Sequence, residues 1–118
     1  MQMNPLNGYK EMMLTLSCNT IEDVLASEDN ATVSFAGICL RVMEKQTKNG
    51  SHMALAVIED QDSEITIVLF PKIYSRCKKY LFPKVRLIVT GIVDRIEAKQ
   101  MRIYVLADSV LPLIKIAN

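Results

Sequence analysis

The sequence predicts a mainly β domain: a small closed barrel of five strands, with one inserted helix and short helices at the N-terminus. Five apolar segments rich in β-branched residues follow one another after residue 31. Turn-forming residues separate them, and two segments carry an internal glycine, which is typical of the sharp bends in a small barrel. A polar segment with helical spacing lies between the third and the fourth.

Length and composition are typical of one globular domain. The chain has 118 residues, half of them hydrophobic, and a formal net charge of +1, which suits a single domain with its own core. No apolar run approaches the ~20 residues that span a bilayer, and no secretory leader pattern is present. We therefore expect a soluble, cytoplasmic protein without a membrane partner. Near-neutral charge also means that any nucleic-acid binding must come from a local patch.

The sequence offers little for catalysis or cofactor binding. The three cysteines, Cys18, Cys39 and Cys77, are widely spaced and without CxxC pairs, so we expect free thiols in a reducing compartment. The acidic cluster at 59–64 has ligands that suit magnesium, but a tight turn explains it better. His52, the only histidine, has no partner residue in view. We expect no catalytic residues, no metal and no cofactor.

Residues 1–30 are predicted to form a helical segment that packs on the barrel. Asn4-Pro5 is typical of an N-cap followed by proline at the first helical position. A second helix is expected to begin at Thr20, where Asp23 completes a variant of the capping box. Both helices are short, so they need a surface to pack against. The barrel domain is expected over 31–118.

The first three strands are predicted to meander. The first, over 32–45, contains Gly37, and Asn49-Gly50 then gives a strong hairpin signal. The return strand is expected over 53–60. After a second tight turn, the third strand is expected over 64–70.

Pro71 is expected to end the third strand and to precede a helix over 72–82. A long strand with an internal Gly91 follows over 84–98, and the last strand is expected over 101–111. Three meandering strands, a helix and a final hairpin form the plan of an OB-fold, a five-stranded Greek-key barrel. Closure of the barrel removes the sheet edges that apolar strands would otherwise expose.

Several short motifs follow one another in the order seen in a known family. They are Val33, Ala36-Gly37, Lys48-Asn49-Gly50, Met53-Ala54, Glu59-Asp60, Ile65, Phe70-Pro71 and Tyr74, preceded by the stretch NPLNGY. In these motifs the chain resembles the OB domain near the C-terminus of bacterial DNA polymerase III alpha subunits. It departs from that pattern at Asn4, Leu55 and Ser63, where the family has histidine, phenylalanine and glycine.

The resemblance implies a nucleic-acid-binding domain linked to DNA replication, as a fragment or as a free-standing relative. Nothing in the chain corresponds to the palm, the fingers or the phosphoesterase module of a polymerase. We therefore expect no polymerase activity from this chain.

Two basic loops are expected to flank one face of the barrel. Their six cations are Arg41, Lys45 and Lys48 from the first loop and Arg95, Lys99 and Arg102 from the second. Basic side chains that converge on one cleft suit the backbone of a single strand. The alternative is that charged loops are ordinary on a soluble barrel and only discourage edge pairing.

The floor between the two loops is predicted to be poor in aromatic rings. Leu55 and Thr66 are expected to face outward, and neither offers a ring for stacking. Tyr104, in phase with Arg102, is the nearest candidate for one stacked base, although partial burial with an exposed hydroxyl is an equal alternative. The inward side of the same strands would carry Ala54, Ala56, Ile58, Ile65 and Ile67. The three phenylalanines, Phe35, Phe70 and Phe82, are expected in the core.

We thus expect a domain that binds single-stranded nucleic acid weakly, DNA more than RNA, and without strong sequence preference. The basic group on the predicted helix, Lys72, Arg76, Lys78 and Lys79, is expected to be a solvated face. Two alternatives remain open. One is a protein-interaction module that contacts replication proteins, and the other is an OB domain that binds RNA or tRNA.

Overall fold

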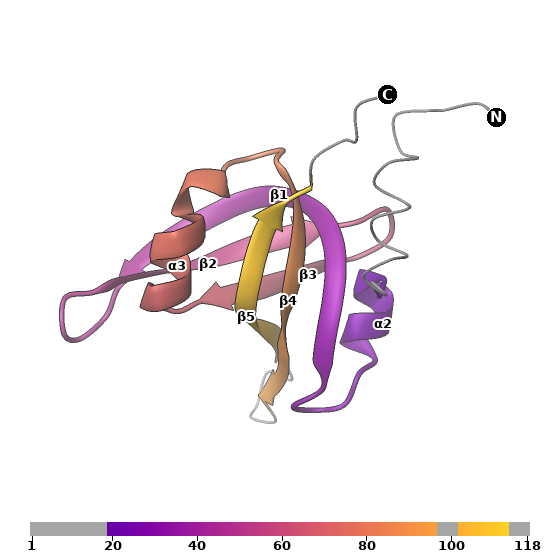
Figure 1. Cartoon of the computed structure of the whole chain (residues 1–118). Helices are drawn as coiled ribbons and strands as arrows, with labels where there is room; N and C mark the ends of the chain where they lie inside the picture. Colours follow the sequence, from indigo (N-terminus) through magenta and orange to yellow (C-terminus); the bar gives the residue numbers. More distant parts are fainter. Residues whose placement is uncertain (1–18, 97–101, 114–118) are drawn as a thin grey trace.

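A computed structural model describes residues 19–96 and 102–113. Its elements are α2 (Ile21–Leu25), β1 (Thr32–Gln46), β2 (His52–Glu59), β3 (Glu64–Leu69), α3 (Pro71–Cys77), the 3₁₀ helix η1 (Lys78–Tyr80), β4 (Arg86–Ile96) and β5 (Arg102–Pro112). The strands close into a barrel in the order β1-β2-β3-β5-β4 (Figure 1). The predicted five-stranded barrel with a helix between the third and fourth strands is confirmed. The first predicted helix lies outside the described residues.

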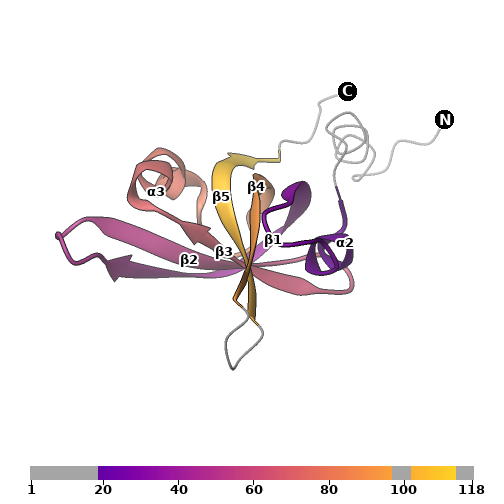
Figure 2. The same ribbon diagram turned by 90° about the horizontal axis from the view of Figure 1, so that it is seen from below.

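β1 is long enough to pair with two different strands of the barrel. Its first part, Thr32–Ile38, pairs antiparallel with β4, and its second part, from Ile38 to Gln46, pairs antiparallel with β2. A register shift between Cys39 and Arg41 marks the bend between the two parts. The end of β1 and the start of β2 extend as a hairpin arm beyond the rest of the barrel (Figure 2).

The two internal glycines lie where neighbouring strands approach most closely. A Cβ atom at Gly91 would lie 2.3 Å from the carbonyl oxygen of Leu106, and one at Gly37 would lie 2.6 Å from that of Glu59. Gly91 also borders a register shift in the pairing of β4 with β5. Both positions therefore require glycine, because a side chain would keep the backbones from coming this close. The irregularity in β4 lies at Gly91 as predicted, whereas that in β1 lies two residues beyond Gly37.

The core fills the barrel with alternate strand residues. The set predicted to point inward is buried: Ala54, Ala56, Ile58, Ile65 and Ile67. Phe35 is fully buried as predicted, but Phe70 is 48% exposed and Phe82 is 52% exposed, so their assignment to the core is wrong. Phe70 is the N-cap residue of α3, and Phe82 follows η1. Neither belongs to a strand, so the inward alternation does not apply to them.

α2 packs against β1 and β3, and its apolar side chains belong to the barrel core. Ile21 and Val24 are completely buried. The predicted capping box is present, because Thr20 Oγ1 accepts from the amide of Asp23 (3.1 Å) and the Asp23 carboxylate accepts from the amide of Thr20 (3.2 Å). This helix of five residues is stabilised by its packing rather than by its own length.

α3 is shorter than the predicted helix over 72–82. Pro71 is its first residue, where a missing N–H is tolerated, and the chain continues as η1 after Cys77. Tyr74 and Cys77 are buried on the side that packs against β2, β3 and β5. No helix in the described part of the chain is long and apolar enough to cross a membrane.

Cys39 and Cys77 are buried free thiols, as expected. Burial raises the pKa of Cys39 and raises that of Cys77 to about 11. Both thiols are therefore protonated and shielded near neutral pH. Cys18 lies outside the described residues.

Candidate nucleic-acid interface

One row of paired residues crosses four strands on the outer face of the barrel. Arg41 on β1 pairs with Val57 on β2, and Val57 pairs with Thr66 on β3. Thr66 in turn pairs with Tyr104 on β5. Partners in register lie side by side on the same face of a sheet. Three of the predicted site residues, from distant parts of the sequence, therefore share one surface.

A second row on the same face is apolar. Met43 pairs with Leu55, and Leu55 pairs with Val68, which pairs with Leu106 on β5. Met43 is 37% exposed, whereas Leu55 is only partly exposed and Val68 is buried. Among the described residues, Tyr104 is the only aromatic one in the two rows. The floor is thus poor in rings, as predicted. Met43 was not singled out from the sequence, because a methionine in a strand usually belongs to the core.

The hairpin arm adds basic side chains to this face. Lys45 lies two residues beyond Met43 on β1 and is exposed, and Lys48 is exposed in the turn at 47–51. Within the described part of the chain, neither lysine forms an ion pair with a carboxylate, and the same holds for Arg41. These three predicted site residues are thus exposed side chains.

The opposite side of the hairpin arm is tied to α3. The Tyr74 hydroxyl donates to the Glu44 carboxylate, which also lies 3.3 Å from Lys78 Nζ and 3.3 Å from His52 Nδ1. The hydrogen bonds from Tyr74 and Lys78 hold the pKa of Glu44 below its usual value. Burial, and then the bond to Glu44, raise the pKa of Tyr74 to about 12. The side chain of Lys78 is 62% exposed, as expected of a solvated face, and it also pairs with Glu44.

Arg95 has a different contact from the one predicted. It was expected to face the cleft from the second loop. Its guanidinium instead donates to the carbonyl oxygens of Leu25 (2.5 Å) and Ser27 (2.7 Å) at the end of α2. Its backbone amide donates to Asp29 Oδ1 (2.9 Å). The side chain thus holds the end of α2 against the barrel, because both carbonyls that it binds belong to that segment.

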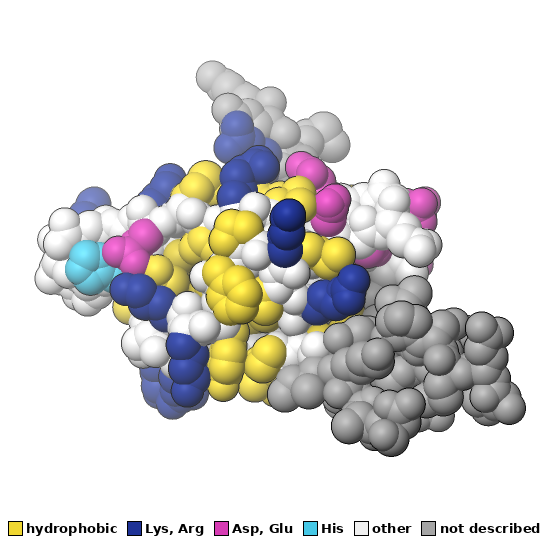
Figure 3. All heavy atoms as spheres, turned by 90° about the horizontal axis from the view of Figure 1, so that it is seen from above, with side chains coloured by type: hydrophobic (Ala, Val, Ile, Leu, Met, Phe, Trp, Pro, Cys, Tyr) yellow, Lys and Arg dark blue, Asp and Glu magenta, His cyan; other side chains and the backbone are white. Residues whose placement is uncertain are grey.

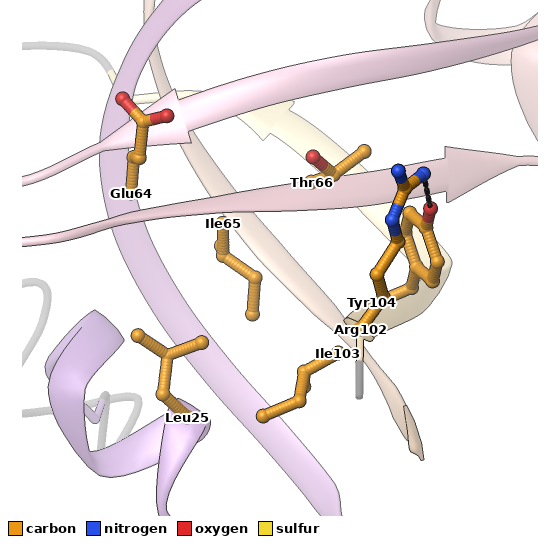
Figure 4. Close-up of a pocket in the computed structure, with 7 residues that line it drawn as sticks. All are labelled: Leu25, Glu64, Ile65, Thr66, Arg102, Ile103 and Tyr104. Atoms are coloured by element: carbon orange, nitrogen blue, oxygen red, sulfur yellow. Dashed lines mark hydrogen bonds between the residues drawn. The ribbon is translucent and has the colours of Figure 1, made fainter. Parts of the chain in front are cut away.

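Arg102 and Tyr104 lie together on the outer face of β5. Arg102 Nη1 is 3.4 Å from the Tyr104 hydroxyl oxygen (Figure 4). Arg102 is exposed and Tyr104 is partly buried. Lys99, predicted beside them, lies outside the described residues.

A pocket of about 340 Å³ opens beside this pair. It forms where β3 and β5 part, since these strands pair only from Thr66 and Tyr104 onward. Three apolar side chains, from Leu25, Ile65 and Ile103, converge within it (Figure 4). Its polar members are Glu64, Thr66, Arg102 and Tyr104. The sequence did not predict this pocket, because it depends on where two strands diverge.

The acidic turn between β2 and β3 is organised by hydrogen bonds. The Asp60 carboxylate accepts from the amides of Ile21 (2.9 Å), Asp62 (3.0 Å) and Ser63 (3.0 Å). Partial burial would raise the pKa of Asp60, but these donors outweigh it and hold that pKa below its usual value. In the described ranges, no group of three or more metal-ligating side chains is placed to hold an ion. Asp60 therefore has the turn-forming role that the sequence suggests.

The chain matches a known family and known proteins over most of its length. Residues 35–113 match the model described as "OB-fold nucleic acid binding domain". The DNA polymerase III subunit alpha of Borreliella burgdorferi is 30% identical over 116 residues, which are 98% of this chain and 10% of that protein. The chain spans about a tenth of the length of the curated relatives it matches. The resemblance inferred from the short motifs is confirmed.

Solved structures share the fold. Aspartyl tRNA synthetase from Entamoeba histolytica aligns with a TM-score of 0.64 and 16% identity, over 86% of this chain and 22% of that one. An OBody bound to hen egg-white lysozyme aligns with a TM-score of 0.67 and 12% identity, over 83% and 94%. The closed five-stranded barrel and the family match lead to the same assignment. This chain belongs to the OB-fold nucleic acid binding domain family.

Proposed function

We propose that this domain binds single-stranded nucleic acid on the outer face of β1, β2, β3 and β5, without catalysing a reaction. The observation that carries the proposal is the row from Arg41 through Thr66 to Tyr104. Arg41, Lys45 and Lys48 supply charge at one end of this row, and Arg102 supplies it at the other. The family match supports a nucleic-acid ligand.

Binding is weak and depends mainly on neutralised phosphates. Each base stacked on an aromatic ring typically contributes ~1–3 kcal/mol, and the two described rows offer one ring. The apolar row with Met43 and Leu55 covers sugars and base faces without hydrogen-bonding to base edges. Most positions along a bound strand are therefore read with little sequence preference.

DNA is the preferred ligand in this proposal. The similarity to DNA polymerase III alpha subunits supports DNA, a place in replication and a cytoplasmic location. The fold likeness to an aspartyl tRNA synthetase favours the RNA alternative. Fluorescence anisotropy with a labelled deoxythymidine 12-mer, its ribo-uridine counterpart and a duplex of equal length separates these ligands.

Charge reversal tests the location of the site. Changing Arg41 and Lys45 to Glu should weaken binding of the deoxythymidine 12-mer at least about tenfold, because each change replaces attraction by repulsion. The matched control changes Lys72 and Lys79, which lie on α3 and η1, to Glu. It alters the net charge equally and should weaken binding less than about threefold. Equal losses from the two pairs would contradict a site on this face.

Exposed apolar side chains favour one rival, a protein-interaction module. Phe82 and Leu111 are each 52% exposed. When the molecule of Figure 1 is viewed from above, hydrophobic side chains gather on the visible face, with lysines and arginines around them (Figure 3). Failure to bind the DNA strand, the RNA strand and the duplex at low salt would favour this rival.

A further inference from the structure

We propose that the pocket between the diverging starts of β3 and β5 binds one unstacked guanine of the bound strand. Glu64 accepts hydrogen bonds from its Watson–Crick edge, and Arg102 donates to its O6 and N7 atoms. The inference rests on the proposed function and adds one base-selective position to it.

The walls of the pocket are fixed by the fold. β3 and β5 pair in parallel over three residue pairs, beginning with Thr66 and Tyr104, and the residues before these pairs line the pocket. The end of α2 supplies a third wall through Leu25. That wall is held in place because the Arg95 guanidinium binds the Leu25 carbonyl at 2.5 Å. An opening fixed by a strand pairing and a side-chain clamp is suited to a rigid ligand.

Size and surface favour a flat, mostly apolar ring. The volume of about 340 Å³ is at the lower end of the ~300–1,000 Å³ typical of small-molecule sites. The side chains of Leu25, Ile65 and Ile103 converge within it and offer apolar contacts to a ring (Figure 4). Tyr104 adds an aromatic ring at the rim. A nucleobase combines such faces with a polar edge.

The polar groups select among the bases. Glu64 lies on the opposite side of the pocket from Arg102 and Tyr104 (Figure 4). An ionised carboxylate only accepts hydrogen bonds, and a guanidinium only donates them. Guanine presents two donors, N1–H and N2–H₂, on one edge and two acceptors, O6 and N7, on the other. It therefore matches a pocket with an acceptor on one side and a two-pronged donor on the other.

Charge disfavours a phosphate as the occupant. Glu64 pairs directly with Glu59 across β2 and β3, and Tyr104 pairs with Asp94 across β5 and β4. Of these three carboxylates, Glu64 is the one that lines the pocket with Arg102, and it disfavours a phosphate but suits a neutral ligand with N–H donors. The basic hairpin arm at the far end of the row takes the phosphates instead. A single bound strand can contact both the hairpin arm and the pocket if one of its bases unstacks from its neighbours at β5.

The test compares deoxythymidine 12-mers that carry one central guanine, adenine, cytosine or inosine, by anisotropy at low salt. The guanine strand should bind at least about fivefold tighter than the plain 12-mer, the lower end of what one bidentate pair provides. The affinity of the inosine strand, whose base lacks the 2-amino group, should lie between the affinities of the guanine strand and the plain 12-mer. Glu64→Gln and Arg102→Lys should each reduce the ratio of guanine to thymine affinity to below about twofold.

Glu59→Gln is the matched control, because it removes the same charge from the direct partner of Glu64 outside the pocket. It should leave the guanine preference intact, and thermal melting checks that each variant is folded. If all strands bind equally, or if Glu59→Gln and Glu64→Gln change the ratio alike, the guanine pocket is wrong while the proposed function stands. If no strand binds at all, the proposed function itself fails.

Discussion

Arg95 on β4 and Leu25 at the end of α2 are joined by a hydrogen bond of 2.5 Å from Nη2 to the backbone carbonyl. The same guanidinium binds the Ser27 carbonyl at 2.7 Å. At the other end of the helix, Asp60 accepts from the amide of Ile21 at 2.9 Å. α2 is thus clamped at both ends by side chains from the barrel, which keeps a wall of the pocket in position.

Loss of the Arg95 clamp should destabilise the fold. Arg95→Ala leaves the Leu25 and Ser27 carbonyls without their donor, and we expect a loss of about 1–3 kcal/mol in the free energy of unfolding. Urea denaturation followed by circular dichroism measures this loss. The exposed Arg41→Ala should change the same quantity by no more than about 0.5 kcal/mol. Equal effects would mean that the clamp contributes nothing beyond an ordinary surface arginine.

Asp60 should make the fold sensitive to acid. Its pKa is lowered in the folded state, so its contribution to stability is present above the unfolded pKa of about 4 and is lost as pH falls through the folded pKa. Asp60→Asn should be less stable than the parent at pH 7 by about 1 kcal/mol, and the difference should shrink below about pH 4. Melting temperatures from pH 3 to pH 7 measure this difference in stability, and the exposed Asp62→Asn is the control. A constant difference across this range would contradict the role of the ionised carboxylate.

Affinity for single strands should fall steeply with salt. The three cations at the basic end of the proposed face, Arg41, Lys45 and Lys48, give a slope of roughly −2 in log K against log salt, at about −0.7 per neutralised phosphate. Anisotropy titrations between low and physiological salt measure the slope. Arg41→Gln should make it shallower by about 0.7, whereas Lys72→Gln on α3 should not change it. A salt-insensitive interaction would show that shape or stacking carries the binding.

Tyr104 should contribute through its ring rather than its hydroxyl. Tyr104→Ala should weaken binding of the guanine-containing strand about tenfold, in line with ~1–3 kcal/mol for one stacked base. Tyr104→Phe keeps the ring and loses only the weak 3.4 Å contact with Arg102, so it should stay within about twofold of the parent. The same anisotropy assay compares the two variants. Equal losses would point to the hydroxyl or to a packing defect.

Periodicity alone predicts most of the strands and many of the buried residues. Alternation over 53–60 and 64–70 places Ala54, Ala56 and Ile67 inside, and the barrel buries all three. The outward set on the same strands follows from the same rule, because side chains of a strand alternate between its faces. The capping box of Thr20 with Asp23 is also readable from the sequence, because both of its bonds are local.

The sequence by itself therefore determines what local rules govern: the succession of strands along the chain, the capping box of α2 and the basic residues of the hairpin arm. Only the tertiary structure decides which distant groups meet. Arg95 binds α2 instead of facing the cleft, Glu44 joins His52 to α3, and the pocket by Glu64 exists because β3 and β5 diverge. These contacts join residues far apart in the chain, and their geometry is set by barrel closure, which no sequence period encodes.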